Sequence, residues 1–164
     1  MRRRQILEST ALAIVMCRVL GVKQGAAATA RAAPQAKLVI HTDAEWRAML
    51  TNDQYLALRH EGTEKPGSSP LINEHRPGTF SCAGCKQPVF SSTAKFDSNT
   101  GWPSFFQPIP GAVATQPDHN LPVERTEAHC TRCSSHLGHV FEDGPPPTGL
   151  RYCINGVALV FTPA

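Results

Sequence analysis

Apolar residues recur at helical spacing only near the start of the folded region. Residues 42–50 and 51–60 are two such stretches, and each begins with two polar residues that can cap a helix. Gly62 follows the second stretch and can end it. The pattern therefore predicts two short helices that pack on a core through an apolar face, made of Trp46, Met49, Leu50 and Leu56.

From residue 79 onward, short apolar stretches alternate with turn residues. Glycine and proline clusters at 101–103, 110–111 and 144–149 separate these stretches. We expect a mainly β domain, an antiparallel sheet assembly with small helices at one end. The predicted strands are 79–81, 89–91, 105–107, 113–115, 124–129, 138–141, 150–154 and 158–162.

The first 33 residues differ from the rest of the chain and have the order of a targeting signal. A basic start precedes a mostly apolar stretch at 11–22 and a small-residue-rich stretch at 26–33. The Arg-Arg-x-Ile-Leu run near the start resembles a twin-arginine signal. We therefore expect residues 1–33 to be a cleaved export signal that directs the protein to the bacterial periplasm. Because Glu8 and Arg18 weaken the apolar stretch, an organelle transit peptide is the alternative.

Loss of this leader changes the charge of the protein. The whole chain has 16 Lys and Arg against 13 Asp and Glu, and six of the basic residues and one of the acidic residues lie in 1–33. The remainder is slightly acidic, so no basic patch suggests a nucleic-acid partner. The leader's apolar stretch is too short to span a membrane, so no membrane partner is expected after cleavage. Residues 34–41 then form a linker and 42–164 the folded domain.

Two Cys-x-x-Cys motifs, Cys82 with Cys85 and Cys130 with Cys133, are the most specific metal signal. Each can offer two thiolates from a tight turn to a tetrahedral zinc ion. The 44 residues between the motifs mean that one ion would join distant parts of the chain. Four sulfur ligands leave no open position, which favours a structural zinc over a catalytic one. Two disulfides are the alternative, because an exported protein can form them.

Cys153 is the one cysteine of the folded region without a partner at short spacing. Alternation along a strand places Arg151, Cys153 and Asn155 on one face. A neighbouring cation favours the thiolate, which is the nucleophilic form of cysteine. Cys153 is therefore a candidate nucleophile, although a lone cysteine in a strand is more often inert core.

His136 and His139 lie three residues apart, with Gly138 between them. A regular strand would aim them at different faces, but a glycine allows a bend or bulge that aims both at one point. Histidine exchanges protons near neutral pH, so the pair could activate Cys153 or protonate a leaving oxygen. A surface pair and two zinc ligands are the alternatives.

Trp102 lies on a turn between Gly101 and Pro103, where burying an indole in a core is difficult. A loop tryptophan beside other aromatic residues can wall a pocket for a small group such as a methyl on sulfur. Core packing is the alternative for Trp102 and the better interpretation for Phe105.

Taken together, these motifs resemble the B-type peptide methionine sulfoxide reductases, which are specific for the R epimer. The resemblance covers about residues 43–163. It implies a fold of two antiparallel sheets, β-tent-like, with one structural zinc held by the four paired cysteines. It also implies thiol-dependent reduction of methionine R-sulfoxide in peptides, which repairs oxidised proteins. The motifs that carry it are the two Cys-x-x-Cys pairs, Phe96-Asp97-Ser98, Gly101-Trp102-Pro103-Ser104-Phe105, His136-Leu137-Gly138-His139-Val140-Phe141, Asp143-Gly144-Pro145 and Gly149-Leu150-Arg151-Tyr152-Cys153-Ile154-Asn155.

The resemblance implies a role for each catalytic candidate. Cys153 would attack the sulfoxide sulfur and become a sulfenic acid as methionine leaves. His136 and His139 would polarise or protonate the departing oxygen, and Asn155 would help to orient them. Arg151 would lower the pKa of the thiol.

The resemblance also bears on the substrate and the reductant. Trp102 would wall the pocket for the methyl group, with Phe141 a weaker candidate. Many members carry a resolving cysteine where this chain has Thr100. Because Cys17 would leave with the leader and four cysteines would bind zinc, no second free thiol is expected to remain. We therefore expect an external thiol, thioredoxin-like or small, to reduce the sulfenic acid of a monomeric enzyme.

Two other functions compete with this interpretation. A zinc-stabilised binding module with an aromatic cage would need Trp102, but neither Cys153 nor both histidines. A zinc hydrolase or deaminase would need an open metal position and a nearby carboxylate base, which four cysteine ligands oppose.

Overall fold

The computed structural model describes residues 37–120 and 122–164. The predicted export signal and the start of the predicted linker lie outside these residues. No helix in the described part is long and apolar enough to cross a membrane. Its elements are α1 (Asp43–Met49), α2 (Asn52–His60), η1 (Pro70–Asn73), β1 (Gly78–Cys82), β2 (Pro88–Ser91), η2 (Ser92–Ala94), β3 (Lys95–Phe96), β4 (Ser104–Phe105), β5 (Val113–Asp118), β6 (Arg125–Cys130), β7 (His136–Phe141), β8 (Arg151–Ile154), η3 (Gly156–Ala158) and β9 (Leu159–Pro163).

Both predicted helices are present, and both begin with a capping box. Thr42 and Thr51 each accept a hydrogen bond from the backbone three residues on, and the side chain at that position reaches back to the cap. These bonds satisfy N–H groups that a helix start leaves free. The left-handed residue that ends α2 is Glu61 (φ 53°), one position before Gly62. A Cβ at Gly62 would lie 3.0 Å from a carbonyl oxygen of α2, so glycine also suits the position that follows.

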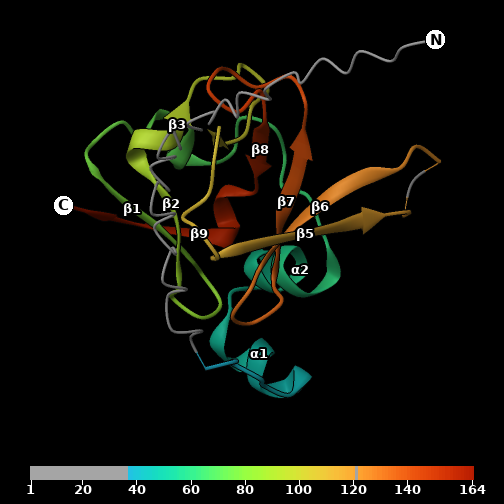
Figure 1. Cartoon of the computed structure of the whole chain (residues 1–164). Coiled ribbons are helices and arrows are strands. Elements are labelled where there is room, and N and C mark those ends of the chain that lie inside the picture. The colour runs from blue at the N-terminus through green and yellow to red at the C-terminus, as the bar shows by residue number, and fades with distance from the viewer. Residues whose placement is uncertain (1–36, 121) are drawn as a thin grey trace, which may run out of the picture. The chain divides into compact units, whose positions relative to one another are not determined.

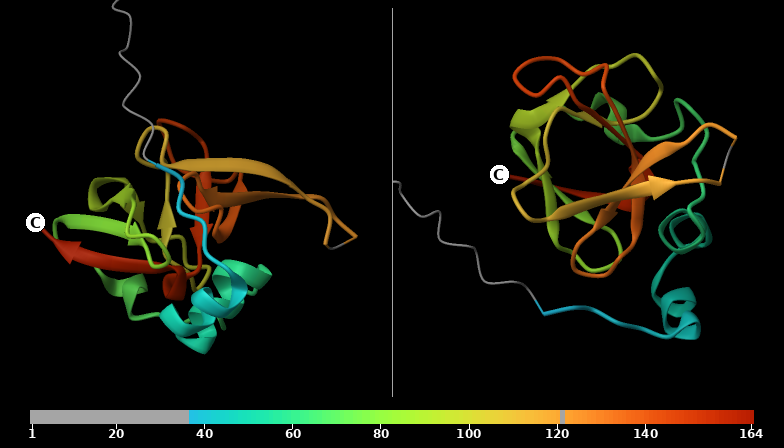
Figure 2. Two further views of the ribbon diagram at one scale, coloured as in Figure 1. Left: turned by 90° about the horizontal axis from the view of Figure 1, so that it is seen from below. Right: turned by 45° about the vertical axis from the view of Figure 1, so that its right-hand side comes forward.

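The strands form two antiparallel sheets, which confirms the predicted fold class. One sheet has the order β2-β1-β9 and the other β3-β4-β8-β7-β6-β5. In Figure 2 (left) the β1–β9 pair and the β5–β6 hairpin extend in opposite directions. Figure 1 shows β7 and β8 side by side in the larger sheet. Helix α2 packs against β7 and η3, so α2 supports the strand that carries both candidate histidines.

Aromatic side chains from both sheets fill the core. Phe80 of β1, Phe90 of β2 and Phe105 of β4 are fully buried. The Phe90 and Phe105 rings stack with centroids 4.3 Å apart, and Phe80 meets Phe105 edge-on at 5.0 Å. Trp46 of α1 is also buried in this core, as its helical spacing predicts, and Leu50 packs against it partly buried. Met49 and Leu56 were predicted on the same packing face, but both are exposed. The core therefore joins the two sheets and fixes β4 beside β8.

The shortest strands differ most from the prediction. β3 has two residues and was not predicted, and β4 covers 104–105 rather than 105–107. Two residues are too few to show the alternation that marks a strand in a sequence. Their pairing with each other and with β8 defines them instead, and such pairing is long-range information.

Candidate active site

Cys153 lies in the middle of β8 and faces residues from both neighbouring strands. In the strand register it is directly opposite His139 of β7 and Ser104 of β4. Residues directly opposite in an antiparallel pair share a face of the sheet. Cys153 lines a hollow of about 130 Å³, here called the Cys153 pocket, with Thr63, Trp102, Arg125, Gly138, His139, Phe141 and Asn155.

A bulge in β7 brings the two candidate histidines together. The register pairs Ala128 with Gly138 but His129 with His136, so β7 has one extra residue at this point. A Cβ on Gly138 would lie only 2.1 Å from the carbonyl oxygen of Cys153, so this close approach of β7 to β8 requires glycine. The rings of His136 and His139 lie with centroids 5.2 Å apart. The bulge predicted beside the glycine is therefore confirmed, but it does not aim both histidines into the Cys153 pocket, because His136 lines a different hollow.

His139 is the histidine that reaches the Cys153 pocket. Its Nε2 lies 2.8 Å from Oδ2 of Asp118, and the same oxygen accepts a hydrogen bond from Arg125 at 2.7 Å. Burial lowers the pKa of His139, against the opposing effect of the Asp118 hydrogen bond. The backbone N–H of Asn120, followed by His139, holds the pKa of Asp118 well below its usual range. Asp118 thus fixes the orientation of the His139 ring.

His136 is buried behind His139 and does not line the Cys153 pocket. Its Nδ1 lies 2.8 Å from Oε1 of Glu127, whose other oxygen accepts from Gln116 at 2.5 Å. Its Nε2 is buried without a hydrogen-bond partner among the described residues. His136, Glu127 and His129 line a separate polar hollow of about 260 Å³. His136 can therefore reach the substrate oxygen only through His139 or through water.

Burial raises the pKa of the Cys153 thiol above its ordinary value, while Thr100 and Arg151 act in the opposite direction. The Thr100 hydroxyl lies 3.9 Å from the Cys153 sulfur. The Arg151 guanidinium forms a two-point ion pair with Asp143 at 2.8 and 2.9 Å, and lies 4.4 Å from the centre of the Phe141 ring. Arg151 therefore favours the thiolate as predicted, but its charge is shared with a carboxylate and does not outweigh burial.

Trp102 and Asn155 hold the segment that edges the pocket. The Trp102 indole donates to the backbone oxygen of Glu64 at 3.1 Å. The Asn155 side chain accepts from the Glu64 backbone N–H at 3.0 Å and donates to the Gly62 oxygen at 3.3 Å. Asn155 is buried and Trp102 half-buried. Both line the Cys153 pocket, but the Asn155 amide supports the backbone at 62–64, and its orienting effect on the histidines stays a prediction.

The four cysteines of the two Cys-x-x-Cys motifs meet in one cluster. Their sulfurs lie within 4.8 Å of one another and could hold a metal ion. The distances are 3.7 Å for Cys82 to Cys133 and 3.5 Å for Cys85 to Cys130, far longer than a disulfide. A tetrahedral zinc ion with bonds of ~2.3 Å would separate its sulfurs by about 3.8 Å, so the cluster fits zinc. Within the described residues Cys153 is the one cysteine outside it.

Several residues at the site were not predicted from the sequence. Asp118, Arg125 and Glu127 hold the two histidines or line the Cys153 pocket, and Thr63 comes to the pocket from the segment after α2. Asp118 is 21 positions from His139, too far for local spacing to connect them. The alternation of Arg125 and Glu127 along one face of the neighbouring strand was the available signal.

Comparison with known proteins places this chain in a family. The SelR domain family matches residues 50–163, which include all of the predicted site residues. The peptide methionine sulfoxide reductase MsrB of Agrobacterium fabrum is 53% identical over 123 residues, which are 74% of this chain and 91% of the relative. The chain belongs to the MsrB family. The MsrB proteins of Thiobacillus denitrificans (54% identical, 74% of this chain and 93% of the relative) and Methanosarcina mazei (50%, 74% and 87%) agree.

Membership of the MsrB family confirms the resemblance drawn from the sequence. Each of these MsrB relatives is matched over most of its own length, so the similarity extends well beyond the short motifs. A solved structure, the Mis18 "Yippee-like" domain, is 20% identical and covers 54% of this chain and 98% of its own, with a TM-score of 0.42. That similarity is too low to show a shared fold.

Proposed function

We propose that the protein reduces methionine R-sulfoxide in peptides and oxidised proteins to methionine, with Cys153 as the nucleophile. One observation supports this above the others: the Cys153 thiol lies in a small pocket beside an indole and a histidine that a carboxylate holds in place. The arrangement suits a group that is apolar at one end and carries a basic oxygen at the other. A methyl sulfoxide has this chemistry.

The proposed step is an oxygen transfer from one sulfur to another. The Cys153 sulfur attacks the sulfoxide sulfur, and a proton reaches the sulfoxide oxygen. The protonated oxygen then moves to the Cys153 sulfur: a sulfur–oxygen bond forms on Cys153, while the sulfur–oxygen bond of the substrate and the transient sulfur–sulfur bond both break. Methionine leaves, and Cys153 is left as a sulfenic acid. Cys153 is oxidised by two electrons and the substrate sulfur is reduced by two.

The polar residues act around this step. His139 gives the proton to the departing oxygen, because it is the histidine in the Cys153 pocket, and Asp118 holds its ring. His136 acts through His139 or water, from its buried position beside Glu127. Asn155 keeps its predicted role of orienting the histidines, exerted through the hydrogen bond that its amide donates to the backbone oxygen of Leu137, between the two histidines, at 3.2 Å.

Three further residues prepare the pocket for the substrate. Arg151 offsets part of the burial that raises the pKa of Cys153. Trp102 forms the wall of the pocket against which the methyl group packs. Its indole N–H already donates to the Glu64 backbone, so the face of its ring can contact the methyl group. Phe141 forms a partly exposed second wall that the Arg151 guanidinium covers on one side.

Regeneration requires an external thiol. Thr100, whose hydroxyl lies 3.9 Å from the Cys153 sulfur, occupies the position where the resemblance expects a resolving cysteine, and the other described cysteines form the metal cluster. Two thiols of the reductant would convert the sulfenic acid to the Cys153 thiol, one disulfide and water. We propose a thioredoxin-like protein or a small thiol as this reductant.

We propose that the ion held by Cys82, Cys85, Cys130 and Cys133 is a structural zinc, one per chain. Its four thiolate ligands would cross-link the turn after β1 to the turn after β6 and leave the chemistry to Cys153. We also propose that the protein is a monomer exported to the periplasm through its twin-arginine-like leader, where it repairs oxidised proteins. A fusion of residues 1–33 to a reporter that is active only after folded export tests the leader.

Turnover of separated epimers tests the proposed activity. The protein lacking residues 1–33 and its Cys153→Ser variant are incubated with R and S epimers of a peptide methionine sulfoxide and dithiothreitol. We expect methionine from the R epimer alone, and none from the variant. Turnover of both epimers, or turnover that survives in Cys153→Ser, would contradict the proposal.

A further inference from the structure

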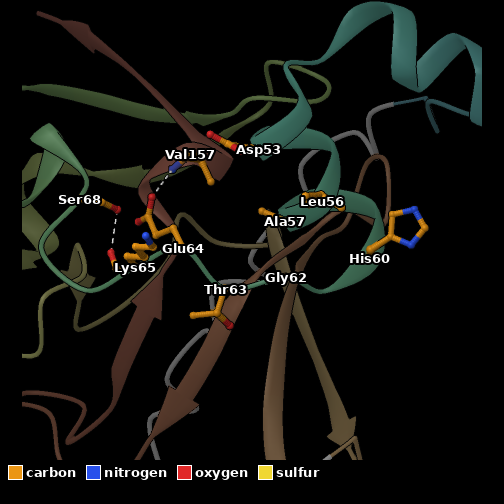
Figure 3. A pocket seen from close by; sticks show the side chains of 10 residues that line it. All are labelled: Asp53, Leu56, Ala57, His60, Gly62, Thr63, Glu64, Lys65, Ser68 and Val157. Carbon is orange, nitrogen blue, oxygen red and sulfur yellow. Dashed lines mark hydrogen bonds between the residues drawn. The ribbon is translucent and has the colours of Figure 1, made fainter.

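A second and larger hollow begins at the edge of the Cys153 pocket. It has a volume of about 600 Å³, and we call it the α2 groove. Thr63 lines both hollows, so they meet at this residue. Figure 3 shows side chains of α2 on one side of the groove and the segment from Gly62 to Ser68 on the other. Val157 of η3 completes the lining.

The groove has an apolar floor and a polar rim. Leu56, Ala57 and Val157 supply the apolar surface, and Leu56 is 46% exposed although it is a large aliphatic side chain. Asp53, His60, Lys65, Ser68 and Thr63 surround this surface with exposed polar groups. An apolar floor inside a rim of mixed charge suits a polypeptide, whose side chain is buried while its backbone meets polar groups.

The Cys153 pocket is too small to hold a polypeptide. Its volume of about 130 Å³ suits the end of one side chain, whereas sites for whole ligands are typically ~300–1,000 Å³. The residues on either side of an oxidised methionine must therefore lie outside it. The α2 groove adjoins the pocket and has the larger volume that these residues require.

Hydrogen bonds also fix the position of the α2 groove relative to the Cys153 pocket. Asn155 and Trp102 bind the backbone of the segment at 62–64, as described above. The Glu64 carboxylate in turn accepts hydrogen bonds from the backbone of Gly156 and of Val157, and Figure 3 shows the bond to Val157. The wall shared by the two hollows is thus fastened to the residues that follow Cys153. A peptide bound in the groove would present its sulfoxide at a constant position.

We propose that the α2 groove is a binding subsite for the substrate polypeptide and takes an apolar side chain close in sequence to the oxidised methionine. This inference rests on the proposed function and adds a preference for particular residues next to the oxidised methionine of the substrate. The enzyme then favours a sulfoxide with an apolar residue close to it in sequence over a sulfoxide flanked by glycine.

Leu56→Glu tests the subsite, because it places a charge on the apolar floor of the groove at an exposed position of a helix. Met49→Glu is the matched control: Met49 is 55% exposed on the neighbouring helix α1 and lines neither hollow. Leu56→Ser is a milder second variant, and thermal unfolding checks that all variants fold. The substrates are pentapeptides with a central methionine R-sulfoxide, flanked by glycine alone or with one leucine before or after it.

The measured quantity is the ratio of kcat/KM for the better leucine peptide to kcat/KM for the glycine peptide. We expect a ratio of about ten for the unaltered protein and for Met49→Glu, corresponding to ~1.4 kcal/mol. In Leu56→Glu the ratio should approach one, with Leu56→Ser between. Equal turnover of all peptides by the unaltered protein, or an unchanged ratio in Leu56→Glu, would overturn the subsite and leave the proposed reaction standing. No turnover of any peptide would overturn the proposed function and the subsite together.

Discussion

Replacement of Gly138 by alanine should strongly lower the activity of the enzyme, although glycine has no side chain that could take part in the reaction. Gly138 lies where β7 passes β8, and an added Cβ would lie 2.1 Å from the Cys153 carbonyl oxygen and 2.9 Å from the Ile154 Cα. Because carbon and oxygen pack no closer than ~3.3 Å, the two strands must separate by roughly 1 Å at this point. The displaced residues are the nucleophile and the bulge that positions His139.

The expected losses follow from this displacement. A misplacement of about 1 Å between reacting groups can cost ~100-fold in rate, so kcat/KM for the R epimer should fall by about that factor. Overpacking of a buried position destabilises by ~1–3 kcal/mol, and the free energy of unfolding should fall within this range. Steady-state kinetics and urea unfolding of Gly138→Ala measure the two effects separately.

Gly111→Ala is the matched control for this prediction. Gly111 has a left-handed φ of 75°, but an added Cβ meets no atom within 4 Å. Its replacement should cost ~1–2 kcal/mol of backbone strain and leave kcat/KM close to that of the unaltered protein. If Gly138→Ala kept full activity, the close approach of β7 to β8 could not be what positions Cys153, and the reasoning would be refuted.

Three further predictions concern charge and metal. Arg151→Met removes a cation that opposes the effect of burial, so the pKa of Cys153 should rise further. Alkylation of Cys153 by iodoacetamide near pH 8 should therefore slow. An unchanged rate would count against a role of Arg151 in favouring the Cys153 thiolate. Asp118→Asn replaces the carboxylate that raises the pKa of His139 by a neutral amide, so the alkaline fall of kcat/KM should begin at lower pH. An unshifted profile would exclude His139 as the proton donor. Chelation should release one zinc ion per chain and lower the melting temperature by many degrees. The Cys153→Ser variant should retain the ion. A melting temperature that chelation does not change would show that the cysteine cluster does not stabilise the fold.

The features visible in the sequence are those carried by local spacing. Thr42 and Thr51 mark the helix starts because a capping box spans only four residues. Gly138 indicated the bulge because no other residue permits so close a backbone approach. The cysteine pairs were apparent for the same reason, since each pair occupies one turn.

Contacts between residues that are far apart in the chain could not be predicted from the sequence. Asp118 meets His139 only because β5, β6 and β7 are adjacent in the sheet, and Glu127 meets His136 across one pair of strands. Local reasoning also placed the two histidines as equals, whereas the bulge leaves His136 buried and only His139 in the Cys153 pocket. The sequence indicated that Arg151 lowers the pKa of Cys153. It could not indicate how strongly burial raises the same pKa, because burial depends on how the whole fold packs.

A single-turnover experiment tests the account most directly. The reduced protein without residues 1–33, freed of added thiol, is mixed with excess R-epimer peptide, and both methionine and the state of Cys153 are measured by mass spectrometry. We predict one methionine per chain and a Cys153 sulfenic acid that a sulfenic-acid trap captures, with no intramolecular disulfide. Absence of methionine, or a disulfide between Cys153 and another cysteine of the chain, would contradict the proposed one-cysteine cycle.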